Sequence, residues 1–116
     1  MILEPIEMAR LAVEAASDKQ ANDIVLLDTR NICGFTDYFV IGSSDSDRQL
    51  LAVHDEIEVR LKQAGIRPLH SEGSAGSGWM VLDYGSVIVH IFAPRERAYY
   101  DLEKLWENAG VILRVQ

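Results

Sequence analysis

Apolar residues recur at helical spacing in two segments of the first half of the chain. The first segment starts at Pro5 and ends near residue 16. The second follows a stretch rich in serine and aspartate, which can cap a helix N-terminus, and it ends at Gly65. Both patterns predict amphipathic helices with one buried face. These faces consist of Ile6, Ala9, Val13 and Ala16, and of Leu50, Val53, Ile57, Leu61 and Ala64.

Short apolar runs predict strands between and after these helices. Residues 23–28 are apolar between two acids, which is typical of a strand covered on both faces, and we expect this strand to be central. Residues 38–41 predict a second buried strand. Residues 67–70 contain a proline and predict a short edge strand, whereas residues 71–78, rich in glycine and serine, predict a mobile loop. Residues 111–115 fit either a terminal strand or an extended tail.

The second half of the chain predicts a hairpin followed by a helix. Two apolar runs, residues 79–82 and 87–92, are joined by residues 83–86, whose glycine can take positive φ. Pro94 then presets the backbone angle at a helix entrance, and Gly110 supplies the helix end. The face of this helix expected to lie on the core consists of Ala98, Leu102, Leu105 and Ala109.

Aromatic residues gather between residues 72 and 106, which contain both tryptophans and three of the four tyrosines. Helical spacing predicts Tyr99 beside Trp106 on one shoulder of the last helix, and Tyr100 among glutamates on its charged side. Trp79 fits either the core or a contact surface, and its indole N–H needs a partner. His90 fits a hydrogen-bonded core position or a role at the same surface. The four large aromatics predict a protein-binding patch, but ordinary surface aromatics would give the same pattern.

The element order predicts a single-domain α/β sandwich with a mixed β-sheet over residues 1–116. Cys33 is the only cysteine, which excludes an intrachain disulfide and favours a reducing compartment. No apolar run approaches transmembrane length, and the N-terminus has no cationic segment before an apolar one. We therefore expect a cytoplasmic protein with no membrane partner.

The charge balance bears on the kind of partner. The chain has 18 acidic and 11 basic residues and a formal net charge of −7. Phosphate backbones are bound by lysine and arginine, so we expect no direct dependence on nucleic acid. An acidic surface suits a basic protein partner, and it equally serves solubility. The spacing of Cys33 and the three histidines supports neither a catalytic dyad nor a metal site.

Longer motifs are distributed along nearly the whole chain. The first half contains Asp18, Ala21, Asp23-Ile24-Val25, Leu27-Asp28, Asp37-Tyr38-Phe39-Val40-Ile41 and Asp47-Arg48-Gln49. The second half contains Glu72-Gly73, Trp79, Asp83-Tyr84-Gly85, Val89-His90-Ile91-Phe92, Arg97, Tyr99-Tyr100, Leu102-Glu103 and Leu105-Trp106. In this order and spacing, over roughly residues 6–107, the sequence resembles the ribosomal silencing factor family, also called the Iojap-like family.

This resemblance implies a nucleotidyltransferase-like α/β fold and a translational repressor rather than an enzyme. It implies binding to the large ribosomal subunit through its interface ribosomal protein fourteen, which would block joining with the small subunit. It implies no catalytic residues, metal or cofactor, and members of the family form homodimers. The residues that we expect to bind the partner are Glu72, Trp79, Asp83, Tyr84, Arg97, Tyr99, Tyr100, Glu103 and Trp106.

Two other functions stay open from the sequence. Ser43, Asp45 and Asp47 resemble a nucleotidyltransferase motif in which a serine holds phosphate and paired carboxylates bind magnesium. In that motif the carboxylates normally lie on a strand beyond the helix, whereas these two lie at a predicted helix entrance, where capping explains them. Alternatively, the aromatic patch is buried in a homodimer that serves as a protein-binding adaptor.

Overall fold

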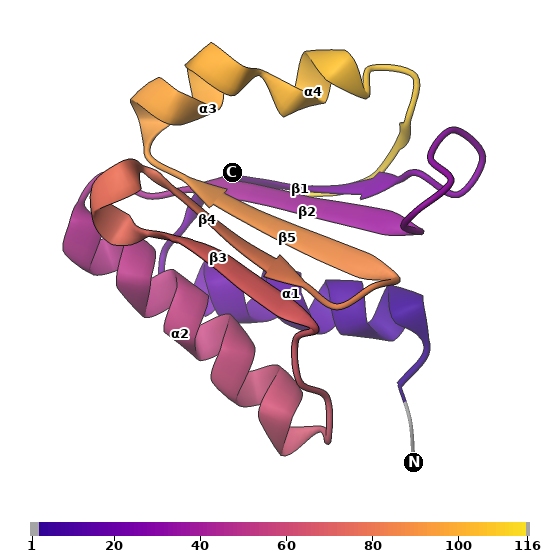
Figure 1. The fold of residues 1–116 in the computed structure, drawn as a ribbon, viewed down its shortest axis with the longest axis horizontal. Helices are drawn as coiled ribbons and strands as arrows, with labels where there is room; N and C mark the ends of the chain where they lie inside the picture. The colour runs from indigo at the N-terminus through magenta and orange to yellow at the C-terminus, as the bar shows by residue number, and fades with distance from the viewer. Residues whose placement is uncertain (1–2, 116) are drawn as a thin grey trace.

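A mixed six-stranded sheet lies between two helical layers in the computed structural model, which describes residues 3–115 (Figure 1). The strands are β1 (Asn22–Asp28), β2 (Tyr38–Ser43), β3 (His70–Ser74), β4 (Trp79–Asp83), β5 (Val87–Phe92) and β6 (Gly110–Val115). Their order across the sheet is β3-β4-β5-β2-β1-β6. β2 and β5 run parallel, and every other neighbouring pair is antiparallel. The predicted α/β class and mixed sheet are confirmed.

The helices divide between the two faces of the sheet (Figure 1). Helices α1 (Pro5–Asp18) and α2 (Asp47–Gln63) cover one face, and α3 (Pro94–Tyr100) and α4 (Leu102–Leu105) cover the other. Alternation along β1 explains why residues 24–27 are all apolar, because Ile24 and Leu26 face α1 and α2 whereas Val25 and Leu27 face the opposite core. β1 is interior, as predicted, with β2 and β6 on its two sides.

The first two helices form where the periodic pattern predicts them. α1 has Pro5 in its first turn and a capping box between Glu4 and Glu7. α2 is capped by Ser46, whose side-chain oxygen accepts a hydrogen bond from the backbone N–H of Gln49 at 3.1 Å. The predicted core faces are buried, apart from half-exposed positions at the ends of the two faces.

The edge strand differs from the prediction. It is β3, residues 70–74, and therefore falls in the segment expected to be a mobile loop; a short 3-10 helix, η1 (Ala75–Ser77), follows it. Residues 67–69 lie outside the strand. Gly73 explains the difference, because its φ of 86° and its close approach to the Trp79 carbonyl oxygen suit only glycine. Glycine in this segment permits close backbone pairing instead of marking a loop.

The single helix predicted from Pro94 to Gly110 is also wrong. Asp101 has a φ of 47°, in the left-handed region, and separates α3 from α4. Aspartate tolerates this conformation better than most side chains. After the break the expected core face no longer holds, since Leu105 is 69% exposed and Ala98 is exposed, whereas Leu102 and Ala109 pack against the core. The chain ends in β6, so residues 111–115 form a strand and not a tail.

Candidate functional site

Trp79 is held in place by a buried histidine on the neighbouring strand. The antiparallel pairing of β4 with β5 puts Trp79 and His90 on the same face of the sheet. The indole Nε1–H donates to His90 Nδ1 at 3.1 Å, so the imidazole proton lies on Nε2. Burial lowers the pKa of His90 to about 4, against a smaller opposing effect of Asp83. The imidazole is therefore neutral near pH 7 and a good acceptor for the indole.

Two tyrosines of α3 extend this arrangement to the surface. The Tyr100 ring lies 4.5 Å from the Trp79 ring, measured between centroids, and Tyr99 meets Tyr100 edge-on at 5.0 Å. Tyr99 is 80% exposed and Tyr100 is 47% exposed. An open groove beside them is lined by Glu72, Gly73, Ser77, Trp79, Val81 and Tyr100. We call Glu72, Trp79, Tyr99 and Tyr100 the aromatic surface.

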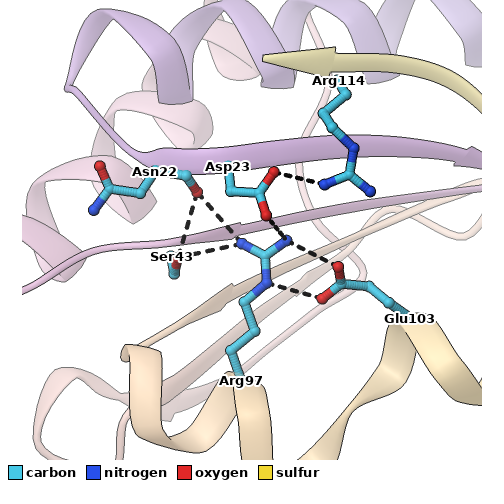
Figure 2. Close-up of polar contacts among 6 residues, drawn as sticks. All are labelled: Asn22, Asp23, Ser43, Arg97, Glu103 and Arg114. Carbon is cyan, nitrogen blue, oxygen red and sulfur yellow. Dashed lines mark hydrogen bonds and ion pairs between the residues drawn. The ribbon is translucent and has the colours of Figure 1, made fainter. Parts of the chain in front are cut away.

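Arg97 links α3 and α4 to the sheet through hydrogen bonds (Figure 2). Its Nε and Nη2 groups donate to the two carboxylate oxygens of Glu103 at 2.9 and 3.2 Å. Its Nη1 group donates to the Asn22 carbonyl oxygen at 3.3 Å and to the Ser43 hydroxyl oxygen at 3.2 Å. Only 11% of the Arg97 side chain is exposed. The guanidinium thus joins α3, α4, β1 and β2 in one set of charge-assisted contacts.

Asp23 extends this network to the last strand. Its carboxylate lies 3.6 Å from Arg97 Nη2 and accepts a hydrogen bond from Arg114 Nη1 at 2.7 Å (Figure 2). Sequence patterns gave no signal for Asn22, Asp23 or Arg114 as parts of a site, because these residues meet through pairings between distant segments. Arg97 and Glu103 thus make their polar contacts within the chain, and their predicted part in partner binding stays a prediction.

Three further residues expected to bind the partner, Asp83, Tyr84 and Trp106, have other contacts within the chain. Trp106 packs against Phe39 and Phe35, at 5.5 and 6.2 Å between ring centroids, so the predicted pairing of Trp106 with Tyr99 is wrong. Tyr84 is buried, and burial raises the pKa of its hydroxyl. Asp83 accepts a hydrogen bond from the Gly85 backbone N–H at 2.7 Å within the hairpin turn.

Tyr100 agrees with its expected place only in part. It is 47% exposed and lines a groove with Glu96, as predicted, but its ring also packs on Trp79 and Phe92. The structure therefore brings together Glu72, Trp79, Tyr99 and Tyr100 at the surface. Val81, which lines the same groove, was not predicted as a site residue, although it shares a strand face with Trp79.

Of the candidate nucleotidyltransferase residues, Ser43 has a structural role, and the two aspartates flank the N-cap residue of α2. The Ser43 hydroxyl donates to the Asn22 carbonyl oxygen at 3.3 Å and accepts from Arg97. Asp45 and Asp47 are exposed where α2 begins, as the capping explanation predicts. Within residues 3–115 neither aspartate belongs to a cluster of three side chains that could hold a metal ion.

Among the helices of residues 3–115, none has the length and apolar character that a membrane span requires.

Comparison with known proteins decides the family. A family model described as "Ribosomal silencing factor during starvation" matches residues 3–116. The chain belongs to the ribosomal silencing factor family. Ribosomal silencing factor RsfS of Bacillus subtilis is 41% identical over 100 residues, which cover 86% of this chain and 85% of that protein. The family prediction is confirmed, and the relative carries the name of a regulator rather than of an enzyme.

Two further similarities extend the comparison. A crystal structure of a Chromobacterium violaceum protein matches with a TM-score of 0.87 and 37% identity, covering 90% of this chain and 88% of that one. The mouse protein named "Mitochondrial assembly of ribosomal large subunit protein 1" is 35% identical over 99 residues, or 83% of this chain and 43% of that protein. The chain therefore has the fold of a solved bacterial protein and is similar in sequence to bacterial proteins and to this mouse protein.

Proposed function

We propose that this protein represses translation in the cytoplasm by binding the large ribosomal subunit through its interface ribosomal protein fourteen. The bound protein blocks joining with the small subunit. Membership of the ribosomal silencing factor family supports a ribosomal target. The mouse relative is named for the ribosomal large subunit, which supports the choice of subunit. The choice of ribosomal protein fourteen rests on the family resemblance.

The observation that carries this proposal is the contact between Trp79 and Tyr100 on the aromatic surface. Large aromatic side chains contribute strongly to protein interfaces, and immobilising them normally costs entropy on binding. Here Trp79 is already fixed by its hydrogen bond to His90, and Tyr100 packs on it at 4.5 Å. Tyr99 projects beyond them into solvent. Trp79 and Tyr100 are thus ordered before a partner arrives, and these two side chains lose little entropy on binding.

Charge complements this surface. The net charge of −7 suits a basic ribosomal protein, and Glu72 lies at the groove beside Trp79. Opposite charges at the edge of an interface speed association and reject wrong partners more than they tighten the complex. Long-range charge thus guides docking, and the aromatic side chains supply the affinity.

Obstruction of subunit joining needs only size, without chemistry. The described residues extend 34 × 33 × 24 Å. A rigid body of this size on the joining face of one subunit keeps the other from approaching. The whole of residues 1–116 acts as one domain in this proposal.

Cosedimentation tests the proposal. The purified protein is centrifuged through sucrose gradients with separated small or large subunits, at near-physiological salt because charged contacts weaken as salt rises. We expect comigration with the large subunit alone and fewer joined ribosomes when both subunits are present. A pull-down with isolated ribosomal protein fourteen then tests the named partner.

Each alternative makes a different prediction in these experiments. Absence from both subunits contradicts the proposal. Binding to the large subunit without any loss of joined ribosomes contradicts the steric mechanism alone. Light scattering over a concentration series measures self-association. A dimer that dissociates when the large subunit is added would show that the dimer contact and the ribosome contact use one surface.

A further inference from the structure

A cluster of potential metal ligands lies on α2, on the sheet face opposite α3, which carries the two tyrosines of the aromatic surface (Figure 1). It consists of His54, Asp55 and Glu58. His54 is buried, Glu58 is half-buried and Asp55 is exposed. The first and last of these residues are four apart, a spacing that puts both side chains on one face of a helix. One turn of α2 thus presents an imidazole and two carboxylates to the same point.

The ligand atoms are close enough to share one ion. One imidazole nitrogen and one oxygen from each carboxylate all lie within 4.8 Å of one another. The distance from His54 Nδ1 to Asp55 Oδ1 is 3.0 Å. Two ligands each about 2.1 Å from a tetrahedral zinc ion are separated by about 3.4 Å. His54 and Asp55, which are hydrogen-bonded in this structure, therefore need to move apart only slightly for an ion to replace the proton between them.

The other nitrogen of His54 has a partner suited to a metal-bound imidazole. His54 Nε2 lies 3.4 Å from the hydroxyl oxygen of Ser71 on β3. A ligating histidine usually donates its second N–H to an oxygen that fixes the orientation of the ring. With an ion in place of the Nδ1 proton, Nε2 carries the hydrogen and donates it to Ser71.

A second feature is the lack of bonded partners at Glu58 and Tyr84, although Lys62 and Arg67 line one groove with Glu58. No hydrogen bond or ion pair within residues 3–115 includes this carboxylate, although it is half-buried. It lies near enough to Tyr84 for its charge to raise the pKa of that hydroxyl, in addition to the larger effect of burial. The Tyr84 hydroxyl oxygen is itself buried and has no hydrogen-bond partner among the described residues. Buried polar groups are normally paired, so the Tyr84 hydroxyl lacks a partner that a water molecule bound to the ion would supply.

We propose that His54, Asp55 and Glu58 bind a divalent transition-metal ion of the zinc type. One imidazole and two carboxylates are ligands that zinc accepts, whereas calcium and magnesium prefer oxygen alone. A water molecule completes the coordination and lies near the Tyr84 hydroxyl. The ion strengthens the link between α2 and β3, because the same imidazole contacts Ser71. The site is separate from the aromatic surface, so metal binding can be tested independently of ribosome binding.

Calorimetric titration with Zn²⁺ tests this site on the full chain after chelator treatment and dialysis. We expect one ion per chain. Asp55→Asn and Glu58→Gln each remove one ligand charge with almost no change in size, and both are expected to weaken binding by at least tenfold, as loss of even an orienting partner does in metal sites (about 10- to 100-fold). Glu107→Gln, a matched change at an exposed residue, and His70→Gln, at an exposed histidine, are expected to bind as the unchanged protein does.

Nitrogen-15 NMR of the imidazole rings gives a second measurement on the unchanged protein. The chain has three histidines, and Zn²⁺ is expected to shift the Nδ1 resonance of His54 while those of His70 and His90 stay in place. Binding that survives both Asp55→Asn and Glu58→Gln, or that is lost with His70→Gln, overturns the proposal and indicates adventitious surface binding. Failure to bind Zn²⁺ at all overturns it equally.

Discussion

Arg97 and Glu103 are joined by two parallel hydrogen bonds across the break between α3 and α4. The break at Asp101 leaves two short helices of 7 and 4 residues. Helices this short are unstable alone and depend on tertiary contacts. The ion pair therefore fixes the angle at which Tyr99 and Tyr100 are presented, although it lies away from the aromatic surface itself.

Arg97→Lys tests this role. Lysine keeps the charge but cannot make the forked contact with Glu103 and also reach Ser43 and Asn22. We expect the free energy of unfolding to fall by about 1 to 3 kcal/mol, the usual range for lost hydrogen bonds to charged groups. Urea denaturation measures it. Arg30→Lys is the control, since that side chain is 57% exposed and pairs only at the surface, where little stability is expected to change. Equal stability of the two variants would show that the network is dispensable.

Gly73→Ala tests the close pairing of β3 with β4. A Cβ atom at this position would lie less than 3.0 Å from the Trp79 carbonyl oxygen, and the φ of 86° disfavours alanine. We expect a loss of more than about 1 kcal/mol in unfolding free energy, together with faster amide hydrogen exchange in β3. Gly76→Ala is the matched control, because nothing lies within 4 Å of its Cβ position. A stable Gly73→Ala protein with a protected β3 would contradict the assigned reason for this glycine.

Periodicity predicted the elements that bury one regular face. α1, α2 and the β4–β5 hairpin follow directly from apolar spacing and turn residues, because local pattern and tertiary packing agree there. β3 was missed because its glycines serve a close backbone approach, which composition cannot distinguish from a loop. The break at Asp101 was missed because the apolar spacing continues past it and a single left-handed residue leaves no periodic signal.

The candidate site was predicted only in part, because its residues come from segments that are distant along the chain. Trp79 and Tyr100 were expected in one patch, and they do meet, but through a helix end and a strand that only the fold brings together. The separation of Trp106 follows from the break at Asp101, which turns the chain toward Phe35 and Phe39. Contacts between distant segments, such as Arg97 with Asn22, depend on sheet order and are invisible to spacing along the chain.

The low pKa of His90 makes stability depend on pH. The folded-state pKa of about 4 lies below the ordinary value of 6.5, so the unfolded chain takes up this proton first as pH falls. Stability is thus fully present above about pH 6.5 and decreases as pH falls toward 4, by up to about 3 kcal/mol for this group. His90→Asn keeps an acceptor oxygen near the Nδ1 position but does not titrate. Its unfolding free energy is expected to change less between pH 7 and 4.5 than that of the unchanged protein. His70→Gln, at an exposed histidine, is expected to keep the original pH dependence.

Tyr99→Ala tests the aromatic surface without disturbing the core. The side chain is 80% exposed, so the unfolding free energy is expected to change by no more than about 0.5 kcal/mol. Binding to the large subunit, measured by cosedimentation over a range of concentrations, is expected to weaken by about 1 to 2 kcal/mol, or roughly five- to thirtyfold, as for an aromatic residue within an interface. Leu51→Ala is the control, because Leu51 is 44% exposed on α2, on the opposite face of the sheet. Equal binding by both variants would remove Tyr99 from the interface. If only Leu51→Ala weakened binding, the interface would lie on the α2 face. The proposed metal site on α2, and not the aromatic surface, would then be the feature to test.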